Sequence, residues 1–422
     1  MSGRPATAVP LSRNRDFQLL WLAQTGSELS QHVFLIAYPL LAVALTDLPI
    51  AAGLLGFLAT GVQLAFGLPA GLLADRYDRR LILVLASAVR ALAHGSLAVA
   101  IWLDAGSYPH LLVVAIVEGL ALAAIFPAEE AALPQVVTAG QLPDAIALNT
   151  ARSSVGQMGG NSLGGVLYGL TRALPFAANA VLQLLATLAL LFVRIPRHHG
   201  RETSSVDSAR RFWPELTGGL RWLLRHPTLR VITACGVLVN LGFGAFLTAF
   251  ILIATAAGVP SGQVGVVVAM LGGGALVGAL LAGRLQRVLR PYVSISAVLW
   301  GAALLTPLLA LTSNMVVAGV VFALVGALVP LANTTIITYQ LVLTPDGLRG
   351  RVSAAVGVFD NVAAALGPLV GSVLVQFTPG RTALFGCAAL LLVPAVLAAL
   401  NRTLRRFSGH TEEDDGKDEV TV

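Results

Sequence analysis

The chain has 422 residues, of which 56% are hydrophobic and only 11% are charged, and its mean hydropathy is +0.81. Soluble domains carry about 25% charged residues, so this composition excludes a water-soluble globular protein. The net charge of +6 does not indicate nucleic-acid binding, because the basic residues lie in short segments beside long apolar runs.

A membrane-spanning helix needs about 20 mostly apolar residues, and the apolar runs of this chain predict twelve such helices. In chain order, they cover residues 17–45, 51–74, 81–103, 111–130, 145–169, 174–194, 228–256, 262–283, 292–312, 315–342, 352–377 and 381–401. We therefore predict an all-α polytopic membrane protein with twelve transmembrane helices.

The longest polar connection divides the predicted helices into two sets of six. The expected parts are an N-terminal six-helix bundle (1–195), a cytoplasmic central loop (196–227), a C-terminal six-helix bundle (228–402) and an acidic cytoplasmic tail (403–422). Glycine-rich stretches that begin at Gly160 and Gly367 are similar and lie about half the chain apart. An even number of helices in each half predicts parallel repeats, related by an axis along the membrane normal.

The basic residues of the connections predict the orientation of the chain. With the N-terminus inside the cell, all but four of the 27 Lys and Arg residues face the cytoplasm, and the exceptions are Arg90, Arg152, Arg172 and Arg381. The polar N-terminal segment shows no cleavable signal pattern, so the first helix would act as its own insertion signal. We expect a multi-pass protein of the cell (inner) membrane with both termini in the cytoplasm.

The connection after the second predicted helix carries the most specific motif, Gly71 to Arg80, which reads GLLADRYDRR. It resembles the G-x-x-x-D-R-x-G-R-R/K loop of the major facilitator superfamily, with Asp78 in place of the second glycine. Three further passages resemble the branch of that superfamily that contains enterobactin exporters and macrolide efflux pumps; they are Arg15–Trp21, Phe126–Leu142 and Leu348–Val352.

The resemblance covers residues 12–402. It implies alternating access, in which two bundles rock about a central site and expose it to one side at a time. In the superfamily, G-P-x-x-G-G on the fifth helix is associated with antiporters, and here Asn161 takes the place of the proline. Close helix packing explains those glycines equally well.

The family loop also suggests a latch between the two halves. Asp75 ends the second predicted helix on the cytoplasmic side, and Arg351 lies where the helix predicted at 352–377 begins. A helix start presents a positive dipole end and free N–H groups, so we hypothesise that Asp75 docks there while the site faces outward. Arg76 and Arg79 belong to this predicted latch, although loop solubility and the orientation signal also explain the basic residues.

Charged residues inside the predicted spans are unfavourable unless they are paired, neutralised or facing water. Arg90 and Glu118 lie at similar depths on consecutive helices, so we expect a structural ion pair. Glu28 lies on the first helix, which lines the cavity in the resembled family. A carboxylate in a low-dielectric cavity is able to bind and release protons near neutral pH. We predict Glu28 as the leading proton-coupling residue and Asp360 as the second.

Polar and aromatic side chains on the expected cavity-lining helices outline a substrate cavity. The candidates are Gln24, Gln63, Phe66, Arg152, Asn161, Asn240, Phe243, Asn333, Thr334 and Tyr339. Such a surface suits a bulky amphipathic compound, although a phenylalanine stripe is also typical of packing or lipid contact.

The only lysine, Lys417, lies in the tail, so no G-x-x-x-x-G-K-[ST] nucleotide-binding loop is present. Signatures of enzymes and of metal sites are absent as well, and we expect no enzymatic activity, cofactor or metal. The expected partners are a small-molecule substrate, protons and the lipid bilayer, without nucleic acid, for a chain acting as a monomer.

Together these patterns predict a secondary transporter that exports a hydrophobic or amphipathic small molecule, such as a drug, siderophore or secondary metabolite, by proton antiport. Two alternatives stay open. One is a proton-coupled importer of a small nutrient, and the other is a membrane sensor that has lost transport.

Overall fold

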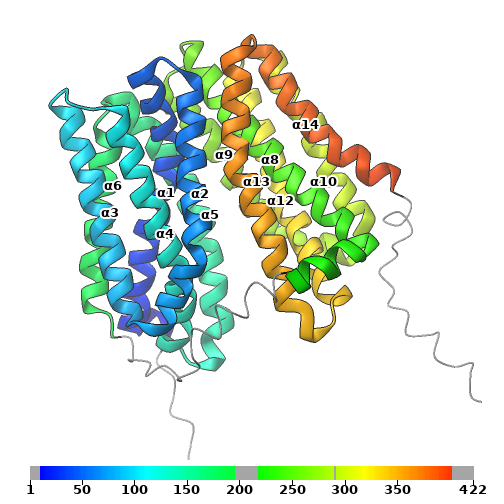
Figure 1. The fold of residues 1–422 in the computed structure, drawn as a ribbon, viewed down its shortest axis with the longest axis horizontal. Helices are drawn as coiled ribbons and strands as arrows, with labels where there is room; N and C mark the ends of the chain where they lie inside the picture. Colours follow the sequence, from blue (N-terminus) through cyan, green and yellow to red (C-terminus); the bar gives the residue numbers. More distant parts are fainter. Residues whose placement is uncertain (1–9, 195–216, 289–290, 402–422) are drawn as a thin grey trace, which may run out of the picture.

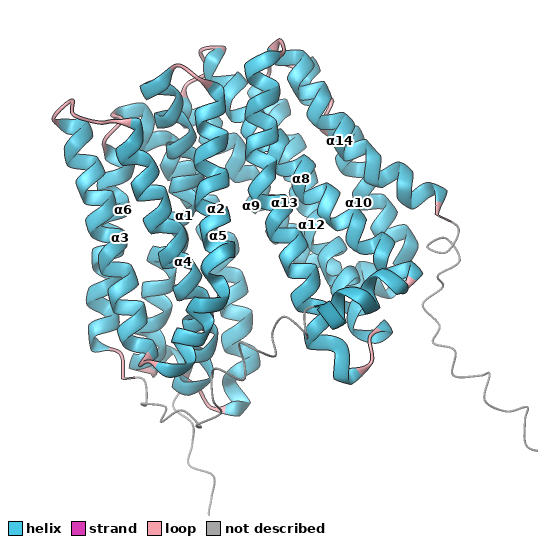
Figure 2. Ribbon diagram, in the orientation of Figure 1, coloured by secondary structure: helices cyan, strands magenta, loops and turns pink. Residues whose placement is uncertain are grey.

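A computed structural model describes residues 10–194, 217–288 and 291–401. Within these ranges the ordered elements are helices, and no strand occurs among them (Figure 2). The predicted acidic tail, 403–422, and most of the predicted central loop lie outside the described residues. The fold predicted from the apolar runs, an all-α polytopic membrane protein, is confirmed.

The N-terminal bundle contains six long helices. They are α1 (Arg15–Thr46), α2 (Pro49–Arg76), α3 (Arg79–Trp102), α4 (Tyr108–Val136), α5 (Leu142–Leu170) and α6 (Leu174–Phe192), with 3-10 turns at Leu11–Arg13 and Ala139–Gln141. Side-chain caps define several of their starts. Asn14 accepts a hydrogen bond from the Phe17 N–H at the start of α1, and Ser107 accepts one from His110 at the start of α4.

The C-terminal bundle repeats this arrangement. Its helices are α8 (Pro227–Ala256), α9 (Ser261–Val288), α10 (Pro291–Leu305), α11 (Leu308–Leu311), α12 (Met315–Leu343), α13 (Arg349–Phe377) and α14 (Gly380–Leu400), with a 3-10 turn at Asp346–Leu348. The helix predicted at 292–312 is divided into α10 and α11 around Pro307, whose ring nitrogen has no hydrogen to donate. Together α10 and α11 make one span.

Eleven of the spans in the described residues are long and apolar enough to cross a membrane by themselves. The remaining one, α5, has 29 residues and is rich in glycine and polar side chains. Its length still suits a span, and it packs between α1 of its own bundle and α9 of the other bundle. The predicted count of twelve therefore includes one helix whose buried residues, mostly glycines, lie where it contacts other helices.

The two bundles meet through two helix pairs, α2 with α13 and α5 with α9. Each pair joins the second span of one half to the fifth span of the other half. This exchange symmetry is what two parallel repeats produce when they face each other.

Contacts between the bundles gather at the end where α1 runs into α2, which we call the closed end. The Ile50 N–H donates to the Gln376 side-chain oxygen at 3.4 Å. A Cβ atom on Gly53 would clash with the backbone of α13, and one on Gly165 would clash with the backbone oxygen of Ser261. Toward the opposite end, where α1 begins, the two bundles diverge (Figure 1).

Candidate functional site

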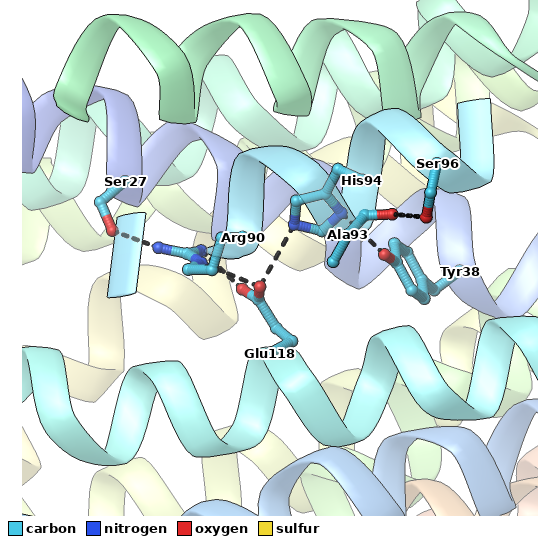
Figure 3. A network of polar contacts seen from close by, with 7 residues as sticks. All are labelled: Ser27, Tyr38, Arg90, Ala93, His94, Ser96 and Glu118. Atoms are coloured by element: carbon cyan, nitrogen blue, oxygen red, sulfur yellow. Dashed lines mark hydrogen bonds and ion pairs between the residues drawn. The ribbon is translucent and has the colours of Figure 1, made fainter. Parts of the chain in front are cut away.

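Arg90 of α3 and Glu118 of α4 form an ion pair in the core of the N-terminal bundle. Arg90 Nε donates to Glu118 Oε2 at 2.9 Å, and Arg90 Nη2 donates to Oε1 at 2.5 Å. Ser27 of α1 accepts from Arg90 Nη1 at 2.7 Å (Figure 3). Arg90 is 0% exposed and Glu118 is 2% exposed. Both charges are therefore compensated by each other and sealed from solvent.

Two further side chains extend this pair into a buried network. His94 Nε2 lies 3.2 Å from Glu118 Oε2, and His94 Nδ1 lies 2.8 Å from the Tyr38 hydroxyl. The neutral tautomer with its proton on Nε2 satisfies both contacts, because it donates to Glu118 and accepts from Tyr38. Figure 3 shows Tyr38 of α1, His94 and Arg90 of α3 and Glu118 of α4 joined by these contacts.

The network also reaches α6, through a residue that sequence analysis did not single out. With the Gln183 amide oxygen directed at Arg90, that oxygen accepts from Arg90 Nη1 at 3.0 Å and from Ser30 Oγ at 3.1 Å. No sequence spacing links Gln183 or Tyr38 to the ion pair, because they come from helices that meet only in the folded bundle. Among the described residues that line the cavity below, none belongs to this network.

Glu28 of α1 has neighbours on both α1 and α5. Ser153 Oγ donates to Glu28 Oε1 at 2.8 Å, and His32 Nε2 lies 3.5 Å from the same oxygen. Arg152 Nη1 lies 3.9 Å from Glu28 Oε2, and the side chains of Arg152 and Glu28 are 9% and 19% exposed. Glu28 is thus held more loosely than Glu118 and keeps some access to solvent.

Glu129 of α4 joins this group and was missed from the sequence. It interacts electrostatically with Arg152 and with Glu28, and it is partly exposed. A signal was present, because Glu129 lies about three helical turns after Glu118 and therefore on nearly the same face of α4. Arg152, a predicted cavity residue, interacts with both carboxylates, and its place in the substrate cavity stays a prediction.

A cavity of about 550 Å³ lies in the C-terminal bundle. Side chains of α8, α9, α10, α12, α13 and α14 line it, and Gln157 of α5 contributes from the other bundle. Four predicted residues form part of its wall: Asn240, Phe243, Asn333 and Asp360. Most of the remaining lining is aliphatic, with Gln340 and Cys235 among the exceptions.

Asp360 is the one charged side chain among the described residues that line this cavity. The side chain of Asn240 hydrogen-bonds to its carboxylate, and Oδ1 faces Gly236 on α8. None of the ion pairs found in the described residues includes Asp360. Among the described residues, the carboxylate therefore has an amide neighbour but no cationic one.

The other predicted cavity residues are not among the described residues that line this cavity. Asn161 is 0% exposed at the contact of α5 with α9, where its backbone oxygen faces Gly265, so α9 covers it in this conformation and its place in a substrate cavity stays a prediction. Gln24 is buried within the N-terminal bundle. Gln63 and Phe66 lie on α2, away from the cavity. The side chains of Thr334 and Tyr339 lie outside the described part of the structure.

The predicted latch is only partly described, because the side chains of Asp75 and Arg76 lie outside the described part. Arg79 Nη1 donates to the Ala131 backbone oxygen at 3.0 Å, which ties α3 to α4 within one bundle. Arg351 is exposed at the start of α13, and its backbone packs against Gly219 in the helical segment 217–225.

Asp78, the residue that departs from the family loop, has a local role. Its side chain accepts from the Arg80 N–H at 2.9 Å and caps the start of α3. Aspartate is a favourable N-cap because its carboxylate satisfies an N–H group that has no partner inside the helix. The change from glycine to aspartate therefore strengthens the start of the next helix.

Residues 6–417 match the protein family described as transmembrane secretion effector. The enterobactin exporter EntS of Escherichia coli O1:K1 / APEC is 25% identical over 401 residues, with 93% of each chain covered. The MFS-type transporter YfiS of Bacillus subtilis (strain 168) is 27% identical over 411 residues, which cover 94% of this chain and 95% of the relative.

Solved structures of transporters share the fold. The nucleoside transporter NupG has a TM-score of 0.73 at 12% identity and covers 94% of this chain and 100% of its own. A bacterial homologue of the human lysosomal transporter Spinster, in an inward-facing and unoccupied conformation, has a TM-score of 0.70 at 16% identity and covers 94% of this chain and 98% of its own. At such identities the likeness shows the fold alone.

Proposed function

Because the chain belongs to the major facilitator superfamily, in its transmembrane secretion effector family, we propose that it exports a hydrophobic or amphipathic small molecule in exchange for protons. The family and the fold are those of membrane transporters, which are not enzymes. A small-molecule substrate that crosses the bilayer unchanged follows from this membership. The direction of transport, the coupling ion and the substrate class are the proposed parts.

Relatives named as exporters support the export direction, and the position of the cavity relative to the closed end is compatible with it. Its lining residues on α13 lie in the first half of that helix, and those on α8 extend from near its start to just past its middle at Phe243, away from the contacts around Gly53 and Gly165. If the N-terminus is cytoplasmic, as the basic connections predict, the bundles diverge toward the cytoplasm. An exporter loads its substrate from that side, whereas an importer releases its substrate there. The relatives named as enterobactin exporters support loading from the cytoplasm.

Coupling to protons is assigned to Glu28 and Asp360. Glu28 is partly exposed and loosely paired, so a change in the position of α5 relative to α1 would alter its contacts with Ser153 and Arg152. Asp360 faces the cavity, and none of the described residues that line it is a cation. In the proposed cycle, these carboxyl groups bind protons from the outer side and release them to the cytoplasm as substrate is taken up.

The latch between Asp75 and the start of α13 belongs to the opposite conformation, in which the diverging ends close. Arg351 would then meet Asp75, with Arg76 and Arg79 positioned nearby. The segment 217–225 now occupies part of the surface at Arg351 and would have to shift to allow this contact.

The test uses inverted membrane vesicles, whose lumen corresponds to the outer side of the cell. Acidifying the lumen should drive accumulation of an exported compound, and Glu28→Gln and Asp360→Asn should each abolish that accumulation while the proteins still insert. A compound that leaves the acidified lumen together with protons would indicate import. Absence of any proton-dependent flux across a chemically diverse panel would favour the sensor alternative.

A further inference from the structure

The described residues that line the cavity in the C-terminal bundle include a negative charge and no positive charge. Asp360 carries the only charged group, and no arginine, lysine or histidine is found among the described lining residues. The remaining polar groups are mostly amides and hydroxyls, which are neutral. A bound anion would therefore meet a negative charge and no positive one.

An empty, ionised carboxylate at this position is only partly hydrated, because Asp360 is partly buried. It lies inside a membrane-spanning helix, in a largely aliphatic cavity, and the Asn240 amide supplies one hydrogen bond but no charge. Burying an unpaired charge is unfavourable unless a proton or a counter-ion neutralises it. The site thus favours occupants that bring a positive charge.

The cations of the N-terminal bundle do not fill this role. Arg90 is committed to Glu118, and Arg152 lies between Glu28 and Glu129. Neither arginine lines the cavity. The described part of the chain therefore supplies no counter-ion for Asp360. A proton or a positively charged occupant is left for this role, and a cavity of this size is suited to a bound substrate.

We propose that this cavity binds an amphipathic organic cation, with Asp360 as its counter-ion. This inference deepens the proposed transport function, and its link to export rests on that function. A volume of about 550 Å³ lies within the range of drug-sized ligand sites, about 300–1,000 Å³. Phe243 adds an aromatic ring to the wall, and an aromatic face attracts a cation.

The class of substrate differs from the one that the named relatives would suggest. Enterobactin exporters handle a siderophore by their printed name, whereas the present cavity selects by charge for an amine or another organic cation with an apolar body. The aliphatic side chains of α8, α10 and α12 would contact that body, and Asn333 and Gln157 would accept or donate hydrogen bonds at its edge.

The experiment measures binding of two ions of nearly equal size and opposite charge. Purified full-length protein in detergent is dialysed to equilibrium against tetraphenylphosphonium, a cation, and separately against tetraphenylborate, an anion. We expect saturable binding of the cation and at least about tenfold weaker binding of the anion. Asp360→Asn should weaken binding of the cation at least about tenfold, because it removes one partner of a desolvated charge pair.

Two further variants keep the result interpretable. Asp360→Glu retains the charge and should retain the preference for tetraphenylphosphonium. Asp104→Asn makes the same chemical change in an outer turn, where the left-handed backbone of Asp104 (φ 54°) also suits asparagine, and should bind like the wild type. If Asp360→Asn does not elute as a folded monodisperse protein, the wild-type cation preference and Asp360→Glu still decide the question.

Equal affinity of the wild type for the two ions would overturn the proposal, and so would unchanged binding of the cation by a folded Asp360→Asn protein. Binding in detergent requires no gradient, so this experiment tests the cation site independently of the proposed export. Cation binding without proton-driven flux would contradict export and leave the site standing. Proton-driven flux of other compounds without cation binding would contradict the site alone.

Discussion

The two bundles share one topology and treat charge in opposite ways. In the N-terminal bundle, Arg90 and Glu118 are sealed together at 2.5–2.9 Å. In the C-terminal bundle, Asp360 faces a cavity with one amide neighbour. A paired and buried charge holds helices in place, whereas an unpaired charge in a cavity is available to a ligand or a proton. The role of a charged residue inside a membrane-spanning helix therefore depends on the side chains around it.

Glu28 lies between these two extremes. Its nearest cation, Arg152, is 3.9 Å away, and its side chain is 19% exposed. The closest contact is a neutral hydrogen bond from Ser153. The N-terminal bundle thus contains one sealed pair and one loosely paired group, and only the second is suited to exchange protons with water. The predictions below compare the sealed pair, Glu28 and Asp360, from the largest expected effect to the smallest.

The largest effect is expected from breaking the sealed pair. Glu118→Ala leaves the Arg90 guanidinium buried and unpaired, which should destabilise the protein by about 3–5 kcal/mol. Thermal unfolding in detergent, followed by size-exclusion chromatography, measures the loss. Replacing both residues with leucine or methionine should recover much of the stability, because no charge is then left without its partner. A mild effect of Glu118→Ala alone would show that the pair does not hold the bundle.

Glu28→Gln should act on transport much more than on stability. The amide oxygen is still able to accept from Ser153, so the unfolding free energy should change by about 1 kcal/mol. Proton-driven accumulation in inverted vesicles should fall to background. Ser153→Ala is the matched control, since it removes the hydrogen bond and keeps the carboxyl group. If accumulation by the Glu28→Gln variant still depends fully on the pH gradient, Glu28 does not couple protons and has a structural role.

Tyr38→Phe tests the far end of the sealed network. It removes the hydroxyl that lies 2.8 Å from His94 Nδ1 and preserves the ring contact with Phe176. A lost neutral hydrogen bond should lower stability by about 1 kcal/mol and leave transport intact. A transport defect without a loss of stability would mean that protons move along Tyr38, His94 and Glu118, and the N-terminal network would then have to be reassigned.

Asp360→Asn should have the smallest effect on stability of the changes to intramembrane acids. It removes a charge that has no cationic partner and retains a group that hydrogen-bonds to Asn240, so a shift within about 0.5 kcal/mol is expected. Thermal unfolding beside Glu118→Ala measures the contrast directly. A large destabilisation would indicate an ion pair that the described residues do not contain.

Periodicity predicted the spans well because lipid leaves few alternatives to an apolar helix. The helix predicted at 174–194 ends at Phe192, and the one predicted at 111–130 extends to Val136, since Pro127 and Pro134 do not interrupt α4. The distance of each residue from the end of its predicted helix also placed Arg90 and Glu118 at similar depths in the membrane. Proline inside a membrane helix is tolerated because neighbouring helices compensate for the lost hydrogen bond.

The parts that the sequence did not predict depend on which helix covers which face. Asn161 looked like a cavity residue, yet the glycine face around it admits α9 so closely that it is fully buried. Tyr38, Gln183 and Glu129 were overlooked because their partners come from other helices. Six helices of the C-terminal bundle and Gln157 of α5 together form the cavity, so the pattern of any single helix does not predict it.

The central claim is that Asp360 lies in a water-accessible cavity whereas the Arg90–Glu118 core is sealed. Thiol labelling tests it most directly in a background with Cys235→Ser and Cys387→Ser, which removes the two native cysteines. Asp360→Cys should react with a water-soluble maleimide added from the cytoplasmic side, and Ala128→Cys, at a position that is 0% exposed, should not. Equal protection of both cysteines from the reagent would contradict the claim.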